Sequence, residues 1–272
     1  MLKLIYITNQ EEIAIIAENN GVDLIFIDLE IKGKEKRQKG RDTVISKHHF
    51  EDIIKIKKVL TSSKLIVRVN PINISSKREI DKVINNGADI IMLPYFKTVE
   101  EVETFLEYVD KRIKTCLLVE TASAVEKIDE IVELEGIDSI YIGLNDLHLS
   151  YRMKFLFEPL ANGTVEKLCS KFKSKGIPYG FGGVASLGKG FLPAEKIIPE
   201  HYRLGSSMVI LSRSFCNTGV ITDLNEIENL FKIELKRFRE YEAEIQKRDD
   251  KFFEKNRIEL VKKVEEIISN IK

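Results

Sequence analysis

Gly21-Val-Asp-Leu-Ile-Phe-Ile-Asp28 is the stretch that decides the fold, because the chain repeats its pattern three more times. Each glycine follows a helical pattern and suits the left-handed backbone position just past a helix end. The apolar run after each glycine is typical of a parallel strand that is buried on both faces. The other three copies are Gly87-Ala-Asp-Ile-Ile-Met-Leu-Pro94, Gly136-Ile-Asp-Ser-Ile-Tyr-Ile-Gly143 and Gly205-Ser-Ser-Met-Val-Ile-Leu211.

Four further apolar runs bring the number of predicted strands to eight; they cover residues 2–7, 64–69, 115–119 and 178–182. Helical patterns lie between them, and several begin with capping-box spacing. The pairs with this spacing are Asn9 and Glu12, Ser76 and Glu79, Thr98 and Glu101, and Ser123 and Glu126. Strands that alternate with helices predict an α/β fold, either a (β/α)8 TIM barrel or an open doubly wound sheet. No GxGxxG or GxxxxGK[ST] motif follows a strand, which favours the barrel.

We predict two parts in the chain: a (β/α)8 barrel over residues 1–221 and a C-terminal helical extension over residues 222–272. The first helix of the extension has an apolar stripe of Leu224, Ile227, Phe231, Leu235 and Phe238. The stripe of the second comprises Leu260, Val264, Ile267 and Ile271. A second amphipathic helix must cover its stripe on its own barrel or on a neighbouring subunit. We favour the subunit and expect a homo-oligomer.

Composition narrows the function classes. The 272 residues hold 43 basic and 43 acidic side chains, and this balance argues against a nucleic-acid partner. No apolar run approaches the roughly 20 residues that span a bilayer, so we expect no membrane partner. Three scattered cysteines without CxxC spacing indicate reduced thiols and a cytoplasmic protein.

Charged and polar side chains stand at the ends of otherwise apolar strands, where the active site of such a barrel lies. These residues are Asp28, Glu30, Arg68, Asn70, Glu120, Asn145 and Asp146. Each has a structural alternative: a carboxylate can cap a helix, and Arg68 can pair with Glu120 or Asp146 across the barrel. The functional interpretation is a hard divalent cation, magnesium or manganese, held by a few carboxylates. A 2-oxo acid can chelate such a cation, which then stabilises an enolate, while Arg68 shares the oxyanion charge.

The chain also resembles a known family. Val-Glu120-Thr-Ala-Ser-Ala and Ile-Gly143-Leu-Asn-Asp146-Leu-His-Leu-Ser are similar to motifs of the HpcH/HpaI aldolase and citrate lyase beta-subunit family, within the phosphoenolpyruvate/pyruvate barrel superfamily. So are Asp28-Leu-Glu30, Val-Arg68-Val-Asn and Gly87-Ala-Asp-Ile-Ile-Met-Leu-Pro94, in the same order along the chain. The resemblance implies a class II, metal-dependent lyase that joins a pyruvate-like 2-oxo acid to an aldehyde acceptor.

The resemblance also implies roles for individual residues. Glu120 and Asp146 would bind the metal, Mg²⁺ with Mn²⁺ or Co²⁺ as alternatives, and Arg68 would contact the enolate oxygen. Backbone amides of the turn formed by Gly143, Leu144 and Asn145 would hold the substrate carboxylate.

The sequence departs from the family pattern at the proton-transfer position. The pyruvate aldolases carry a histidine directly after the glutamate that matches Glu30, and this chain has Ile31 there. We take His48 and His49 as substitutes, with a solvated surface role as the alternative. His148, two residues past Asp146, is either a third metal ligand or a supporting residue. The turn has Leu144-Asn145 where those aldolases favour Pro-Ala.

Two loops after predicted strands are candidates for substrate contact. Residues 32–41 hold six basic side chains and form either a solvated loop or a lid that attracts an anionic substrate. The glycine-rich stretch from Gly180 to Gly190 lets backbone approach the substrate. Two other functions stay open: an acyl-CoA lyase of the citrate or malyl type, and a barrel that binds a 2-oxo acid without catalysis.

Overall fold

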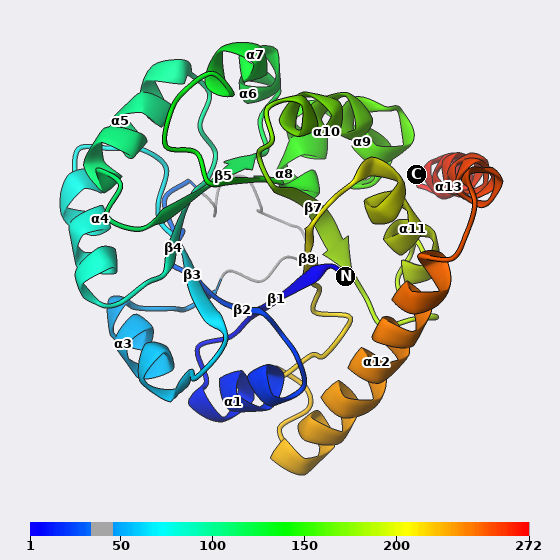
Figure 1. Cartoon of the computed structure of the whole chain (residues 1–272), viewed down its shortest axis with the longest axis horizontal. Coiled ribbons are helices and arrows are strands. Elements are labelled where there is room, and N and C mark those ends of the chain that lie inside the picture. The colour runs from blue at the N-terminus through cyan, green and yellow to red at the C-terminus, as the bar shows by residue number, and fades with distance from the viewer. Residues whose placement is uncertain (34–45, 272) are drawn as a thin grey trace.

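The computed structural model describes residues 1–33 and 46–271, and it shows a ring of strands enclosed by helices (Figure 1). The strands are β1 (Lys3–Ile7), β2 (Leu24–Asp28), β3 (Lys64–Arg68), β4 (Ile90–Leu93), β5 (Lys114–Val119), β6 (Ser139–Ile142), β7 (Tyr179–Val184) and β8 (Met208–Leu211). The barrel helices are α1 (Glu11–Asn19), α3 (Phe50–Val59), α4 (Ser76–Asn85), α5 (Val99–Val109), α6 (Ala122–Glu126), α7 (Ile128–Ile131), α8 (Leu144–Ser150), α9 (Glu158–Ala161), α10 (Thr164–Ser174) and α11 (Ala194–Leu204). The chain ends with α12 (Leu224–Ile245) and α13 (Asp250–Asn270).

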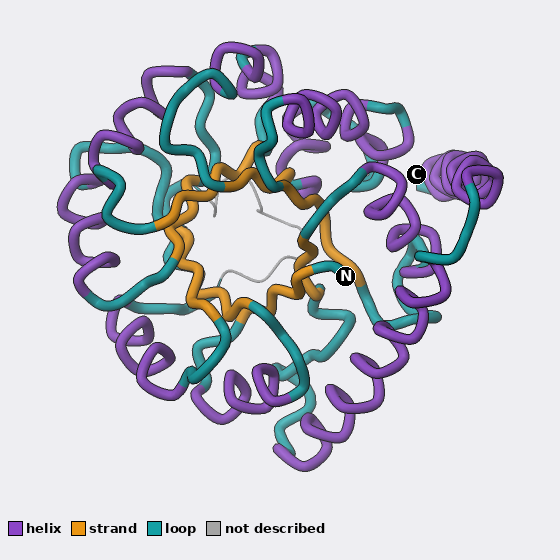
Figure 2. Tube along the Cα trace, viewed as in Figure 1, coloured by secondary structure: helices purple, strands orange, loops and turns teal. Residues whose placement is uncertain are grey.

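The sheet closes on itself as predicted. Each strand pairs in parallel with the next, and β8 pairs with β1, so the open doubly wound alternative is excluded (Figure 2). The pairing is irregular between β7 and β8, where the register shifts between Gly180 and Gly183. A Cβ on Gly180 would lie 2.4 Å from the Met208 carbonyl oxygen, so only glycine allows the two strands to approach this closely.

The repeated Gly-x-Asp pattern has a structural purpose at the amino ends of the strands. In three copies the aspartate, just before an even-numbered strand, accepts a backbone hydrogen bond from the start of the preceding strand. Asp23 Oδ2 accepts from Leu4 N at 2.8 Å, Asp89 Oδ2 from Leu65 N at 2.8 Å, and Asp138 Oδ2 from Thr115 N at 2.8 Å. Each aspartate therefore ties two neighbouring strands together and satisfies a backbone donor.

The strands separate two apolar cores. Side chains such as Phe26, Ile66 and Leu118 point into the barrel, whereas their neighbours in sequence pack against the helices. Because side chains alternate along a strand, Asp28, Arg68 and Glu120 lie two residues further on the same inner face. The inner core therefore ends in a layer of charged groups at the carboxyl ends of the strands.

The predicted helix starts are only partly confirmed. Thr98 and Glu101 form the expected capping box at the start of α5. The other three caps are wrong by one or two residues: α1 starts after Gln10, α4 after Ser75 and α6 after Thr121. Tertiary contacts explain two of these shifts. The Asn9 amide donates to Asp52 instead of capping α1, and Glu79 accepts from Asn70.

The two C-terminal helices are confirmed and cover the outside of the barrel next to α11 (Figure 1). The stripe of α12 is buried at Ile227, Phe231 and Phe238. The α13 stripe packs on α9 and α11 of the same chain through Leu260 and Val264. These two side chains are therefore buried without a neighbouring subunit. A homo-oligomer stays a prediction. Within the described ranges, no helix is long and apolar enough to cross a membrane.

Candidate active site

A cavity of about 820 Å³ opens at the carboxyl ends of the strands, and all the predicted site residues except His49 line it. Its wall includes Arg68 from β3, Glu120 from the end of β5, and Gly143 to Asp146 after β6. The inner core forms its floor through Phe26, Met92, Leu118 and Tyr141. A cavity with an apolar floor and a few convergent charged groups is the usual form of a small-molecule site.

Arg68 is held on one side of this cavity by two carboxylates. Its Nε and NH2 atoms donate to Asp28 Oδ1 and Oδ2 at 2.9 and 2.8 Å, and NH1 lies 3.4 Å from Glu30 Oε2. Asp28 and Arg68 are register partners on β2 and β3, so their side chains emerge next to each other. The suggested pairing of Arg68 with Glu120 or Asp146 therefore gives way to Asp28 and Glu30 as its direct partners.

Burial and charge act in opposite directions on this guanidinium. Burial alone lowers the pKa of Arg68, but the charges of Asp28, Glu30 and, at longer range, Glu120 raise it above its ordinary value. Arg68 therefore keeps its positive charge across the whole accessible pH range, and the bidentate pair fixes the plane of the guanidinium. The Arg68 guanidinium is therefore a positive charge whose position in the site is set before any ligand binds.

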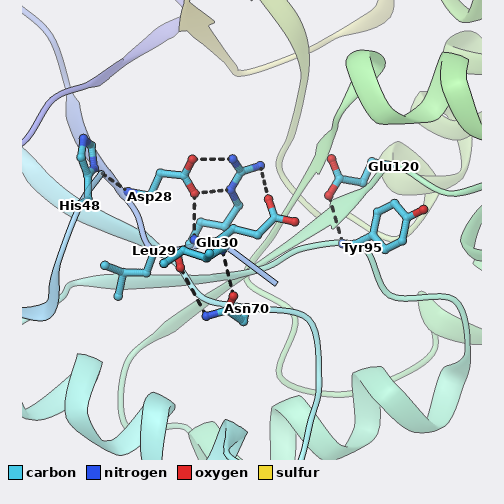
Figure 3. A network of polar contacts seen from close by, with 9 residues as sticks. Asp28, Leu29, Glu30, His48, Asn70, Tyr95 and Glu120 are labelled. Atoms are coloured by element: carbon cyan, nitrogen blue, oxygen red, sulfur yellow. Dashed lines mark hydrogen bonds and ion pairs between the residues drawn. The ribbon is translucent and has the colours of Figure 1, made fainter. Parts of the chain in front are cut away.

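Asn70 holds the loop that carries Glu30. Its Oδ1 atom accepts from the backbone of Ile31 and Lys32 at 3.0 and 2.9 Å, and its Nδ2 atom donates to the Leu29 carbonyl at 3.3 Å. Glu79 in turn accepts from the Asn70 amide at 2.8 Å. Figure 3 shows this network together with the contacts of His48 and Asp28 and, beside it, the contact between Glu120 and Tyr95. The Ile31 side chain is half exposed, and its backbone supports the loop.

Glu120 is buried and is positioned by backbone from two neighbouring segments. Its Oε1 atom accepts from the N–H of Tyr95 at 3.1 Å, and Tyr95 has a φ of 51°, an unfavourable value for a residue with a side chain. On the other side, a Cβ on Gly143 would lie 2.7 Å from Glu120 Oε2. The glycine therefore leaves the room in which the carboxylate sits.

Asp146 belongs to the first turn of α8 and is buried at the same cavity. The Gly143 N–H donates to the Val119 carbonyl at 3.0 Å, so it is already used within the barrel. Leu144 and Asn145 occupy the first helical turn, where N–H groups have no intrahelical acceptor. Of the predicted amide donors, these two are therefore the ones suited to a ligand. His148 is buried, with Nδ1 3.1 Å from the Leu144 carbonyl.

The donors at this end of the barrel suit a hard cation. Glu120 and Asp146 offer carboxylate oxygens, which Mg²⁺ prefers, and Mg²⁺ usually keeps several coordination positions for water or substrate. In the part of the chain that the structure describes, no three histidine, cysteine, aspartate or glutamate side chains are grouped as a metal site. A cation held by two carboxylates alone would take the rest of its coordination from water and substrate.

The two candidate histidines lie in different environments. His48 is buried in the cavity wall, and its Nδ1 atom accepts from the Asp28 N–H at 3.0 Å. A neutral His48 therefore carries its proton on Nε2. His49 is exposed and precedes α3, where its N–H donates to Asp52 at 2.8 Å; among the described residues that line the cavity it does not appear.

The two loops singled out in the sequence have different outcomes. Gly182 and Gly183 line the cavity, in agreement with the expected approach of the glycine-rich stretch. Of the basic loop, residues 34–41 lie outside the described residues, and Lys32 donates to Asn73 at 2.6 Å. Sequence reasoning missed Asp28 as the partner of Arg68 and the Tyr95 N–H as a donor to Glu120. Asp28 ends the strand next to the strand of Arg68, and this position was the available signal for the Asp28–Arg68 pair. No signal in the sequence pointed to the Tyr95 N–H.

The family follows from the sequence model that the chain matches. Residues 4–157, more than half of the chain, match the HpcH/HpaI aldolase/citrate lyase family. Comparison with curated proteins gives no match.

Solved structures share the barrel at low identity. The HpcH/HpaI aldolase from Desulfitobacterium hafniense DCB-2 is 17% identical, with a TM-score of 0.60, over 81% of this chain and 92% of that one. An HpcH/HpaI aldolase/citrate lyase family protein from Burkholderia cenocepacia J2315 is 15% identical, with a TM-score of 0.61, over 83% and 94%. Citrate synthase SbnG is 19% identical, with a TM-score of 0.60, over 83% and 92%. This chain belongs to the HpcH/HpaI aldolase/citrate lyase family and is a lyase that acts on carbon–carbon bonds.

Proposed function

We propose that the protein is a divalent-metal-dependent aldolase that forms or breaks a carbon–carbon bond between a pyruvate-like 2-oxo acid and an aldehyde. The observation that carries this proposal is the cavity in which two buried carboxylates, Glu120 and Asp146, stand together with a fixed guanidinium, Arg68. Oxygen ligands for a hard cation next to a permanent positive charge suit a reaction that develops negative charge on an oxygen.

Glu120 and Asp146 would hold the cation, Mg²⁺ first, with Mn²⁺ or Co²⁺ as alternatives. When bound, the cation supplies positive charge beside the 2-oxo group and so polarises its carbonyl. The backbone around Gly143 and the Tyr95 N–H keep the Glu120 carboxylate in one orientation. Because the carboxylate is already oriented, no free energy is spent on rearranging it when the substrate binds.

The chain's own residues would bind and orient the 2-oxo acid. Arg68 faces the developing enolate oxygen, and its bidentate pair with Asp28 prevents it from turning away. The N–H groups of Leu144 and Asn145 would receive the substrate carboxylate.

His48 is the residue best placed to move the proton. The Asp28 N–H occupies Nδ1, so Nε2 is the nitrogen that can exchange a proton with substrate or with a water molecule. His48 thereby takes over the role that Ile31 cannot perform, from a different position in the same loop region.

Proton exchange tests this function without knowledge of the aldehyde. Pyruvate is incubated with the protein and Mg²⁺ in D2O, and loss of the methyl proton signal is followed by NMR. We expect exchange that stops with EDTA or in Glu120→Gln, and that falls more in His48→Gln than in His49→Gln, whose side chain is exposed. Binding of pyruvate and Mg²⁺ without proton exchange would instead indicate a barrel that binds a 2-oxo acid without catalysis. A thioester product formed when CoA is added would favour the acyl-CoA lyase alternative.

A further inference from the structure

A second cavity, of about 410 Å³, lies beside the first at the ends of β7 and β8. We call it the β7–β8 basin and define it by its polar lining residues, Lys189, Ser212, Arg213, Ser214 and Asn217. Two cationic side chains and two hydroxyl groups converge there. Among the described residues that line the basin there is no aspartate or glutamate. The polar lining of the basin therefore consists of hydrogen-bond donors and cationic side chains, the chemistry that binds an oxyanion.

The basin adjoins the central cavity. Ser212, Arg213 and Asn217 line both of them, so the two cavities meet along these three residues. This boundary differs from the ends of β2, β5 and β6, where Asp28, Glu120 and Asp146 place carboxylates in the lining of the central cavity. A second anionic group, at the far end of the acceptor, is attracted toward Lys189 and Arg213 in the basin.

Hydrogen bonds hold the loop after β8 in a defined shape. The Ser212 N–H donates to the Val184 carbonyl at 2.8 Å, and the Phe215 N–H donates to the Ser212 carbonyl at 2.9 Å. Buried Ser186, in the loop after β7, donates to the Phe215 carbonyl at 3.3 Å. These hydrogen bonds connect the two loops, so the backbone segments that carry Lys189 and Arg213 are held relative to each other.

The charge of Lys189 also reaches the loop after β8. Burial raises the pKa of the Cys216 thiol, and the positive charge of Lys189 opposes that rise. Cys216 lines the central cavity, and its carbonyl accepts from the Tyr6 hydroxyl at 3.2 Å. Lys189 therefore contributes to the electrostatic field at the boundary between the basin and the site.

We propose that the β7–β8 basin binds the anionic end of the aldehyde acceptor, a phosphate or a carboxylate group. This rests on the proposed aldolase function, since the acceptor is the substrate that would enter beside the 2-oxo acid. The loops after strands 7 and 8 are a frequent site for phosphate in barrels of this architecture. The acceptor then lies with its aldehyde near the central cavity and its charged end on Lys189 and Arg213.

The first test measures binding without turnover. Inorganic phosphate and, separately, succinate are titrated calorimetrically into the wild-type chain and into Lys189→Ala/Arg213→Ala. The control is Lys232→Ala/Arg237→Ala, which removes the same charge from exposed positions of α12. We expect one anion to bind the wild type and the control, and to bind the basin variant about tenfold or more weakly. The preferred anion identifies the end group. Equal affinity in all three proteins, or no binding of either anion to the wild type, overturns the proposal.

The second test uses turnover with matched acceptors. The ratio of kcat/KM for glyceraldehyde 3-phosphate over glyceraldehyde, and for 5-oxopentanoate over pentanal, is measured with pyruvate and Mg²⁺. For the acceptor with the preferred end group, we expect this ratio to fall about tenfold in Lys189→Ala/Arg213→Ala and to stay constant in the control. A constant ratio in both variants contradicts the proposed binding of the acceptor's anionic end in the basin. Absence of pyruvate proton exchange in the wild type contradicts the aldolase function instead, and the phosphate and succinate titrations then decide the basin alone.

Discussion

The two ends of the barrel hold the same kind of group, a carboxylate at low exposure, and use it differently. At the amino end, Glu18 accepts from the backbone of Ser63 at 2.7 Å, and Glu242 accepts from the backbone of Leu2 at 2.8 Å. At the carboxyl end, Glu120 and Asp146 face an 820 Å³ cavity. Carboxylates at the amino end replace water for backbone donors and so stabilise the fold. Those at the carboxyl end line the cavity at the end of the barrel where active sites of this architecture lie, and we propose that they act in the reaction.

The repeated eight-residue segment contains a carboxylate of each kind, one that stabilises the fold and one that lines the cavity. In its first copy, Asp23 ties β1 to β2 at the amino end, and Asp28 holds Arg68 at the carboxyl end. One strand length separates a structural carboxylate from a site carboxylate. The difference between them lies in their surroundings: Asp23 accepts a backbone N–H, with Arg239 3.5 Å away, whereas Asp28 forms a bidentate pair with Arg68.

The largest effect is expected at the carboxyl end. Glu120→Gln keeps the shape of the side chain and removes its charge, so it should reduce Mg²⁺-dependent pyruvate affinity and turnover by about 10³-fold, on the order of 4 kcal/mol. The melting temperature should change little. Titration calorimetry and thermal unfolding measure the two quantities. A variant with unchanged Mg²⁺-dependent affinity would remove Glu120 from the metal site.

The complementary change at the amino end should affect stability alone. Glu242 is fully buried and accepts from Leu2, from the Tyr202 hydroxyl and from Arg239. Glu242→Gln leaves part of this network unsatisfied and should lower the free energy of unfolding by about 3 kcal/mol. Glu240→Gln is the matched control, since Glu240 is exposed on the same helix, and it should cost below about 0.5 kcal/mol. Guanidinium unfolding distinguishes them; equal stability of the two variants would contradict the structural role.

A smaller effect is expected where backbone shapes the site. Gly143→Ala places a Cβ where Glu120 Oε2 now lies, so it should displace the carboxylate and reduce turnover about tenfold. Gly163→Ala is the control: that glycine has a φ of 87° and open space around it, so the change strains the backbone away from the site. It should lower stability by about 1 kcal/mol without reducing Mg²⁺ affinity. Steady-state kinetics with unfolding curves for both variants check this. Full turnover in Gly143→Ala would show that Glu120 does not need its present position.

The smallest effect is a pH dependence at the amino end. Burial raises the pKa of Glu18, but backbone donors from Ser63, Ser62 and Thr61 outweigh it and lower the pKa to about 2. A carboxylate with a lowered folded-state pKa stabilises the protein above the unfolded value of about 4.3, and this contribution is lost as pH falls toward 2.

Guanidinium unfolding at several pH values measures this contribution. The stability difference between the wild type and Glu18→Gln should therefore shrink from about 2 kcal/mol at pH 6 to below about 1 kcal/mol at pH 3. Glu12→Gln, at an exposed position of the same helix, corrects for the loss of one negative charge. A difference that is constant with pH would show that these hydrogen bonds add no net stability.

Strands and strand ends were predictable because their signals are local. The apolar runs after Gly21, Gly87, Gly136 and Gly205 became β2, β4, β6 and β8. Most of the polar residues at the strand ends line one cavity, because parallel strands in a closed barrel end on the same rim. Helix caps were less predictable: Asn9 has the right chemistry for a cap, yet its amide donates to Asp52, 43 residues away.

The amino-acid sequence by itself determined eight strands that alternate with helices and placed Arg68, Glu120 and Asp146 at or just after strand ends, because periodicity and residue type act over a few neighbouring residues. The pairing of β8 with β1, which closes the barrel, was decided by tertiary structure. Tertiary structure alone decided which groups hold these side chains. Register placed Asp28 beside Arg68, a strained Tyr95 aimed its N–H at Glu120, and α9 and α11 covered the stripe of α13. These contacts join residues far apart in the chain, so they depend on how the strands and helices pack, which no local pattern encodes.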